Sequence, residues 1–208
     1  MPTYLSFSPS VLTSHLFWYS SLMKPINTLL TIIFISLLSS PSWSENFGDL
    51  VKRDGLFYKK FTDVPFSGEV TGDDQGSVKN GEKDGAWISY YRNGQLRNKI
   101  NWKNGKRDGA WVVYHENSQL RTKGNYKNGK YEGAKVDYYE NGQLSSKGNH
   151  KNGKSEGAWV YYYENGQLAQ KGNQKIGKME GAWVAYQRDG TVWKKWTGTF
   201  KNDVKISD

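Results

Sequence analysis

A glycine recurs every 24 residues through most of this chain, and this period limits the possible folds more than any other feature. Each of these glycines begins a similar phrase: Gly-Ala-Trp-Val-x-Tyr, then Asn-Gly-Gln-Leu, Lys-Gly-Asn and Lys-Asn-Gly-Lys. A unit repeated at this length indicates stacked supersecondary elements that bury their apolar side chains against neighbouring units. Five copies cover residues 85–204, with a two-residue insertion near Trp193–Trp196 in the last. The repeated glycines are Gly85, Gly109, Gly133, Gly157 and Gly181.

Each unit contains two turn signals, with β-branched and aromatic residues between them. Asn-Gly supplies the two positive φ angles of a two-residue type I′ hairpin turn, so we predict such a turn at both positions. No helical period is found after residue 45, and the sequence therefore predicts an all-β fold. The expected architecture is an open single-layer antiparallel meander with two strands per copy. The first turn series is Asn93-Gly94, Asn117-Ser118, Asn141-Gly142, Asn165-Gly166 and Asp189-Gly190, and the second is Asn104-Gly105, Asn128-Gly129, Asn152-Gly153 and Ile176-Gly177.

Two-residue turns would fix the pairing register of each hairpin. In the fourth copy Tyr163 would face Leu168, Tyr161 would face Gln170, and Trp159 would face Gly172. The same count places Trp111 opposite Gly124. We therefore expect a tryptophan ring to lie over a cross-strand glycine on one face of the sheet.

The opposite face is expected to carry a series of lysines and a series of tyrosines, which together form the candidate binding surface. Residues 85–204 contain 21 basic and 10 acidic side chains. Solvation and protection of strand edges explain such lysines without any ligand, and the functional alternative is attraction to anionic lipid, a cell-wall polymer or an acidic partner. The tyrosines would form an apolar ridge or a stacking platform for sugar rings. The candidate residues are Lys99, Lys123, Lys147, Lys171, Tyr90, Tyr114, Tyr138 and Tyr162.

The third copy departs from the pattern, because Lys135 stands where the other copies have tryptophan. Lys135 and Asp137 would lie two residues apart on the face that carries the rings. This pair is interpreted either as an exposed ion pair or as a polar notch for a partner.

Few residues in the sequence are suited to catalysis. The chain has no cysteine, and His115 and His150 occupy repeat positions that other copies fill with aromatic residues. No nucleophile elbow, phosphate loop or metal-ligand motif is found. We expect a protein that is not an enzyme and holds no cofactor or metal.

The N-terminal 44 residues predict export. Met23 and Lys24 precede an apolar run from Ile26 to Leu38, and small residues follow, with cleavage expected between Ser44 and Glu45. Residues 1–22 have no charged side chain, which suggests that translation begins at Met23. The mature chain would be periplasmic or secreted in a bacterium; the alternative is an uncleaved signal anchor in the inner membrane. Residues 45–84 would form a divergent head or first repeat, and residues 205–208 a tail.

The repeated phrases resemble a known family. Asn-Gly-Gln-Leu, Lys-Gly-Asn-Tyr-Lys-Asn-Gly-Lys at residues 123–130 and Glu-Gly-Ala-Trp are similar to the MORN-repeat variant of the bacterial YwqK family of toxin–antitoxin antitoxins. Residues 53–56 and 65–68 resemble the head of that family. The resemblance implies an open β-hairpin repeat fold, a non-catalytic binding role and, from the antitoxin label, a toxin partner.

Three functions are therefore expected to compete. The sequence favours an exported scaffold that binds a protein. The alternatives are an antitoxin that neutralises a toxin, and a binding module for anionic lipid or cell-wall glycan. Nucleic acid is disfavoured, because the chain carries an export signal and many acidic residues lie near the turns.

Overall fold

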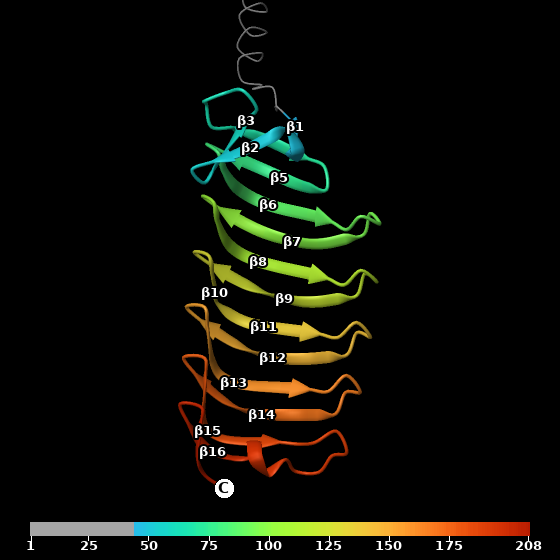
Figure 1. The fold of residues 1–208 in the computed structure, drawn as a ribbon, viewed down its shortest axis with the longest axis vertical. Helices are drawn as coiled ribbons and strands as arrows, with labels where there is room; N and C mark the ends of the chain where they lie inside the picture. The colour runs from blue at the N-terminus through green and yellow to red at the C-terminus, as the bar shows by residue number, and fades with distance from the viewer. Residues whose placement is uncertain (1–43) are drawn as a thin grey trace, which may run out of the picture. The chain divides into compact units, whose positions relative to one another are not determined.

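The computed structural model describes residues 44–208, and in this part of the chain the predicted open antiparallel meander is confirmed (Figure 1). One sheet contains 15 strands, and their spatial order follows their order in the chain from β4 to β17, with the short β10 beside β9. A second sheet pairs β2 with β3. Apart from Ser44, the predicted export signal and the preface before it lie outside the described residues.

Short loops join the strands of this meander. The N-terminal head contains β1 (Ser44–Asn46), η1 (Phe47–Asp49), β2 (Leu50–Arg53), β3 (Leu56–Lys59), β4 (Gly68–Thr71) and β5 (Asp74–Lys79). The repeats contain β6 (Glu82–Tyr90), β7 (Leu96–Lys103), β8 (Lys106–Tyr114), β9 (Leu120–Lys127), β10 (Lys130–Tyr131), β11 (Gly133–Tyr138), β12 (Leu144–Lys151), β13 (Lys154–Tyr162) and β14 (Leu168–Lys175). The chain ends with β15 (Lys178–Ala185), η2 (Lys194–Trp196), β16 (Gly198–Lys201) and β17 (Val204–Ser207). The parallel pairing of β1 with β4 departs from the antiparallel pattern.

The second turn series has the predicted type I′ conformation. Asn104 and Gly105 have φ angles of 47° and 68°, so both central residues are left-handed. Ile176 adopts the same conformation, with a φ of 55°, although it is β-branched. The stacked neighbours hold this turn, because Gly177 N donates to Ser155 O at 2.9 Å.

The prediction of type I′ turns for the first series was wrong. In the fourth copy only Gly166 has a positive φ, of 83°, and Gly166 N donates to Tyr163 O at 2.9 Å. Asn165 Oδ1 accepts from Gln167 N at 3.0 Å, which stabilises a three-residue loop. The longer loop shifts the register, so Leu168 faces Tyr162 rather than Tyr163. A second register shift, between Tyr162 and Tyr161, restores the predicted pairs of Tyr161 with Gln170 and Trp159 with Gly172.

The glycine that begins each repeat marks a β-bulge. These five glycines have φ angles between 74° and 99°, a conformation that other residues rarely adopt. Between β12 and β13 the register moves from Lys147–Val160 to Asn149–Glu156, so one residue of β12 faces three residues of β13. Bulges of this kind bend a strand, and the long strands in Figure 1 are visibly curved.

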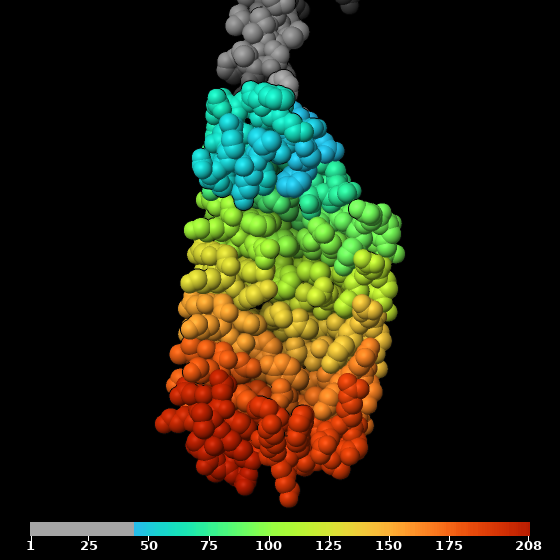
Figure 2. Space-filling view, viewed as in Figure 1, coloured from blue at the N-terminus to red at the C-terminus, as the bar shows by residue number. Residues whose placement is uncertain are grey.

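Aromatic clusters close both ends of the repeat array. At the head, Phe47 and Phe57 pack against a buried cluster that contains Phe66 and Trp87. At the other end, the inserted residues form η2, and Trp196 packs with Trp183 and Phe200. Figure 2 shows the repeats as successive bands across the surface between these ends. None of the helices described in residues 44–208 has the length and apolarity needed to cross a membrane.

Candidate binding surface

Aromatic side chains form a continuous row on one side of the sheet, which we call the ring face. The four repeat tryptophans, Trp87, Trp111, Trp159 and Trp183, are only 2–7% exposed. Successive ring centroids along the row are 4.5–6.5 Å apart. Contacts at this spacing contribute about 0.5–1.5 kcal/mol each beyond burial. The row runs through Trp111, Tyr126, Tyr131, His150, Trp159, Tyr161 and Trp183, and thus links the repeats to one another.

Glycine makes room for the tryptophan rings, but on the strand opposite to the expected one. A Cβ added at Gly148 would lie 2.2 Å from the ring of Trp159, and one at Gly172 would lie 2.1 Å from the ring of Trp183. The expectation that Trp159 covers Gly172 was therefore wrong, although the two residues are cross-strand partners. The ring turns to the preceding strand because its Nε1 donates there, to Asn149 O at 3.2 Å.

Trp111 is the exception to this rule. The residue equivalent to the covered glycine is Ile100, which is the cross-strand partner of Trp111 and would obstruct its ring. The ring lies instead over Gly124 on the following strand, as predicted, with Nε1 2.9 Å from the position of an added Cβ. In this orientation Trp111 Nε1 is buried without a hydrogen-bond partner. The space over Gly124 is free because Lys135 replaces the tryptophan of the third repeat. The substitutions at 100 and 135 therefore compensate each other.

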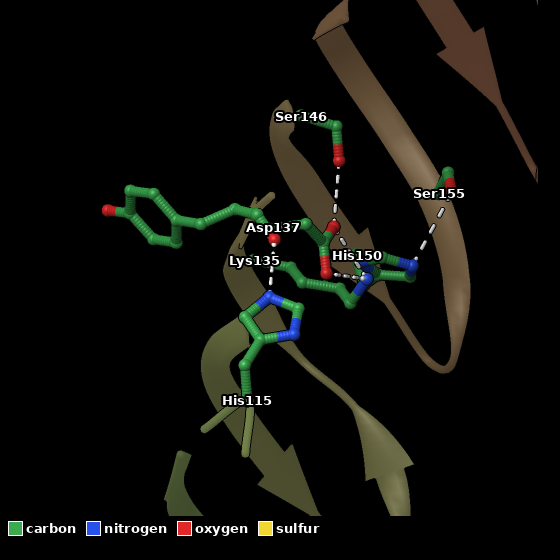
Figure 3. Close-up of polar contacts among 7 residues, drawn as sticks. His115, Lys135, Asp137, Ser146, His150 and Ser155 are labelled. Atoms are coloured by element: carbon green, nitrogen blue, oxygen red, sulfur yellow. Dashed lines mark hydrogen bonds and ion pairs between the residues drawn. The ribbon is translucent and has the colours of Figure 1, made fainter. Parts of the chain in front are cut away.

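Lys135 and Asp137 form a half-buried ion pair on the ring face, so the expectation of an exposed pair was wrong (Figure 3). Lys135 Nζ lies 2.7 Å from both Asp137 carboxylate oxygens, and Ser146 Oγ donates to Asp137 Oδ2 at 2.7 Å. The side chains of Lys135 and Asp137 are 22% and 25% exposed. This arrangement fills the gap left by the missing tryptophan with groups that satisfy one another.

The surroundings of Asp137 favour its charged form. Burial raises the pKa of this carboxyl, but hydrogen bonds from Lys135 and Ser146 and the Lys135 charge outweigh burial, so the pKa lies below its usual value. Thr122, the cross-strand partner of Asp137, acts in the same direction, although its Oγ1 makes no hydrogen bond of normal geometry. Asp137 therefore stays ionised and paired at neutral pH.

Both histidines of the repeats replace aromatic residues in structural positions. His115 Nε2 lies 3.1 Å from Tyr138 O, as the hydroxyl of Tyr139 lies 2.8 Å from Tyr162 O. His150 packs between Tyr131 and Trp159. Burial and the nearby charge of Lys135 lower the pKa of His150, partly offset by Asp137. This agrees with the interpretation of both residues as parts of the aromatic framework.

The acidic residues beside the lysine-rich turns have a structural role that the sequence did not reveal. Each carboxylate accepts a hydrogen bond from the backbone of a turn in the next repeat, 20–22 residues along the chain. Glu156 Oε2, for example, accepts from Ile176 N at 3.0 Å. The acids are therefore held at the turns and do not pair with the lysines. They are Asp84, Asp108, Glu132, Glu156 and Glu180.

The face opposite the rings, which we call the lysine face, carries a row of alternating apolar and basic residues. The row crosses nine strands as Ile88, Lys99, Val112, Lys123, Val136, Lys147, Val160, Lys171 and Val184. Its four lysines, here called the row lysines, are exposed, and none has an ion-pair partner within residues 44–208. The structure thus brings the predicted lysine series into one line.

Eight further lysines, here called the paired lysines, stand beside the type I′ turns. They form four cross-strand pairs: Lys103–Lys106, Lys127–Lys130, Lys151–Lys154 and Lys175–Lys178. All eight are exposed. Like charges directly opposite each other in a sheet are destabilising, so these pairs do not serve the fold.

The predicted tyrosine series also lies on the lysine face, because each tyrosine follows a member of the row by two residues. Tyr90, Tyr114, Tyr138 and Tyr162 are half-buried, and no ring contact joins any two of them in the described structure. Lys135 and Asp137 lie on the opposite face, so the structure divides the predicted site residues between two surfaces.

Two adjoining hollows lie on the lysine face between the Val/Lys row and a parallel row of alanine and asparagine. One, of about 380 Å³, is lined by Ala158, Val160, Lys171, Asn173, Ala182 and Val184. The other, of about 300 Å³, is lined by the equivalent residues one repeat earlier and shares Ala158 and Val160. The backbone of Gly172 or Gly148 forms the floor, since each glycine has no side chain. The sequence did not reveal these hollows, because their walls come from three different strands.

Comparison with known protein families finds a match for four of the repeats. Residues 83–104, 107–128, 131–152 and 155–175 are similar to the MORN repeat variant. The match covers four consecutive copies, and it is consistent with a repeat-based binding scaffold. Within residues 44–208, no cluster of three or more His, Asp or Glu side chains is suited to hold a metal ion.

Two further comparisons add little. No curated protein matches the chain. Among solved structures, the chain is similar to the GtfA/B complex bound to UDP and GlcNAc, at 13% identity and a TM-score of 0.22. This similarity covers 64% of the present chain and 24% of that chain, so the present chain spans about a quarter of its length.

Proposed function

We propose that this MORN-repeat chain is an exported, non-enzymatic scaffold that binds another macromolecule along its lysine face. One observation carries the proposal: the two faces of the sheet are used differently. On the ring face, the repeat tryptophans are buried and linked by ring contacts. On the lysine face, three exposed lysines recur in each of the first four repeats, and none of these twelve has an ion-pair partner in the described residues. The lysine face is therefore the surface available to a partner.

Electrostatic energy supports the same assignment. The four cross-strand lysine pairs oppose folding slightly, and the acids that could neutralise them are held at the turns. Residues 85–204 carry 21 basic and 10 acidic side chains, so the excess charge is positive along the repeats. An anionic partner would relieve this repulsion and gain from the steering effect of the field.

Export rests on the pattern of residues 23–44, and cell fractionation tests it. We expect a protein that begins at Glu45 in the periplasm or medium. Full-length protein retained in the cytoplasm would contradict export and would favour the antitoxin alternative. Full-length protein in the inner membrane would instead support the signal anchor.

Affinity capture tests the binding role. Wild-type protein and a variant with Lys123, Lys147 and Lys171 changed to Glu would be used to capture partners from the exporting cell. We expect a macromolecule that the wild type retains and the variant does not. Equal retention of every captured molecule by both proteins would overturn the assignment to the lysine face.

A further inference from the structure

We infer that the lysine face binds a polypeptide in the polyproline II conformation that carries Asp or Glu at every third position. The inference rests on the proposed scaffold function and names the chemistry of the partner. It follows from the spacing of the row lysines, from the hollows beside them and from the absence of fixed counter-charges.

The spacing of the lysines selects the conformation of the ligand. Successive row lysines are two strands apart, which is about 9.4–9.8 Å in a sheet. A polyproline II helix has three residues per turn and rises about 3.1 Å per residue, so equivalent side chains recur about every 9.3 Å. The two periods differ by about 0.5 Å or less per repeat. A β-strand ligand would repeat about every 6.7 Å and would lose register at the second lysine.

The hollows offer a second feature with the same period. Gly148 and Gly172, which form their floors, are also two strands apart, so these two shallow apolar depressions lie about 10 Å from each other. Ala158 and Ala182 are exposed in their walls, which keeps each hollow open. Proline-rich ligands dock into apolar grooves in the preformed polyproline II conformation, with little loss of conformational entropy, and here alanine and valine supply the apolar walls.

The charges fit the same ligand. A carboxylate at every third residue points to one side of a polyproline II helix and can meet one row lysine per turn. One lysine of each pair stands four residues beyond a row lysine on the same strand, for example Lys175 beyond Lys171, at most about 13 Å away. The ligand would therefore lie between two lines of positive charge, above an apolar floor.

Synthetic peptides test the inference with the purified protein. The probe is a peptide of five Glu-Pro-Pro triplets, long enough to pass all four row lysines. The spacing control has five Glu-Pro pairs, which keep the charge and the polyproline II tendency but change the period. The charge control has five Gln-Pro-Pro triplets. We expect the first peptide to bind about tenfold more tightly than the second at low salt and the third to show no binding.

Matched variants locate the site. Changing Lys147 and Lys171 to Glu should weaken binding of the Glu-Pro-Pro peptide about tenfold, because two attractive pairs become repulsive. Changing Lys194 and Lys195, two exposed lysines of η2 outside both lines of lysines, to Glu should leave binding nearly unchanged. Replacing Ala158 and Ala182 with Phe fills the hollows without changing charge, and it should also weaken binding.

Three results would overturn the inference: equal affinity for the two acidic peptides, equal loss in the two charge-reversal variants, or sedimentation with phosphatidylglycerol vesicles while no peptide binds. The proposed function fails separately. If the wild type captures a cellular macromolecule that the Lys123, Lys147 and Lys171 variant loses, the scaffold role stands even when the peptides do not bind. If nothing is captured, the scaffold role falls as well.

Discussion

The compensation between Ile100 and Lys135 gives the most specific prediction about stability. Replacing Lys135 with Trp restores the repeat pattern, but the new ring would need the space over Gly124 that the Trp111 ring already occupies. Asp137 would be changed to Val in the same variant, so that no unpaired carboxylate remains. Replacing Ile100 with Gly would let Trp111 turn to the preceding strand, where Asn101 O would become available to its Nε1, as Asn149 O is to Trp159.

The expected coupling comes from the overpacking alone. Overpacking two indole rings costs about 1–3 kcal/mol in the Lys135–Asp137 variant, and this cost should vanish when Ile100 also becomes Gly. The buried Trp111 Nε1, which now has no partner, would gain a hydrogen bond of about 1 kcal/mol in both proteins that carry Gly at position 100, so this gain cancels. We therefore expect the combined variant to be more stable than the sum of the separate effects by about 2 kcal/mol. For a domain of this size that corresponds to about 4–8 °C in Tm.

A double-mutant cycle would measure this coupling. The free energy of unfolding would be obtained from urea denaturation, followed by far-ultraviolet circular dichroism, for the wild type, the Ile100 variant, the Lys135–Asp137 variant and the combined variant under one condition. Loss of the Lys135–Asp137 ion pair is common to two of the four proteins and cancels in the coupling. Additivity within about 0.5 kcal/mol would refute the argument that Trp111 and residue 135 compete for one space.

Three further predictions test other parts of the fold. Because the pKa of His150 is lowered, the unfolded chain binds its proton more readily, and the free energy of unfolding should fall as the pH drops below about 6.5. His150→Tyr should make the free energy of unfolding, measured by urea titration, fall less between pH 7 and pH 5. An unchanged pH dependence would show that His150 is not the group responsible. Glu156→Ala should lower the free energy of unfolding by about 1 kcal/mol, because the turn loses a hydrogen bond. Glu156→Gln should keep most of that stability, because the amide oxygen can still accept the bond. Equal losses in the two variants would assign the effect to the charge of Glu156. Lys154→Glu should raise stability by about 0.2–1 kcal/mol, because it faces Lys151, and a lower Tm would contradict the repulsion between these lysines.

The fold was largely predictable from the repeat, but the turn conformations were not. The same Asn-Gly dipeptide forms a type I′ turn at Asn104 and a three-residue loop at Asn165. At Asn165 the side chain binds Gln167 N, whereas at Asn104 the backbone N–H binds the Asp84 carboxylate from the preceding repeat. The first interaction is local and the second is not. Contacts between repeats therefore determine the conformation of the turn, and these contacts cannot be predicted from the dipeptide alone.

The candidate surface was predictable only where strand alternation determines it. The row lysines share a face because a period of 24 residues preserves the alternation of side chains, and the register then aligns them. The burial of Lys135 was not predictable, because it depends on the orientation of the Trp111 ring, which in turn depends on Ile100. Side-chain direction within one face is decided by packing rather than by period.

Lysine acetylation read by mass spectrometry tests the central claim most directly, namely that the ring face holds the fold and the lysine face is free. Brief treatment of the native protein should modify Lys147 and Lys171 several times faster than Lys135, which is half-buried and bonded to Asp137. Unfolding in urea should remove the difference. Equal rates in the native protein, or protection of Lys147 and Lys171 with rapid modification of Lys135, would contradict the division of the sheet into these two faces.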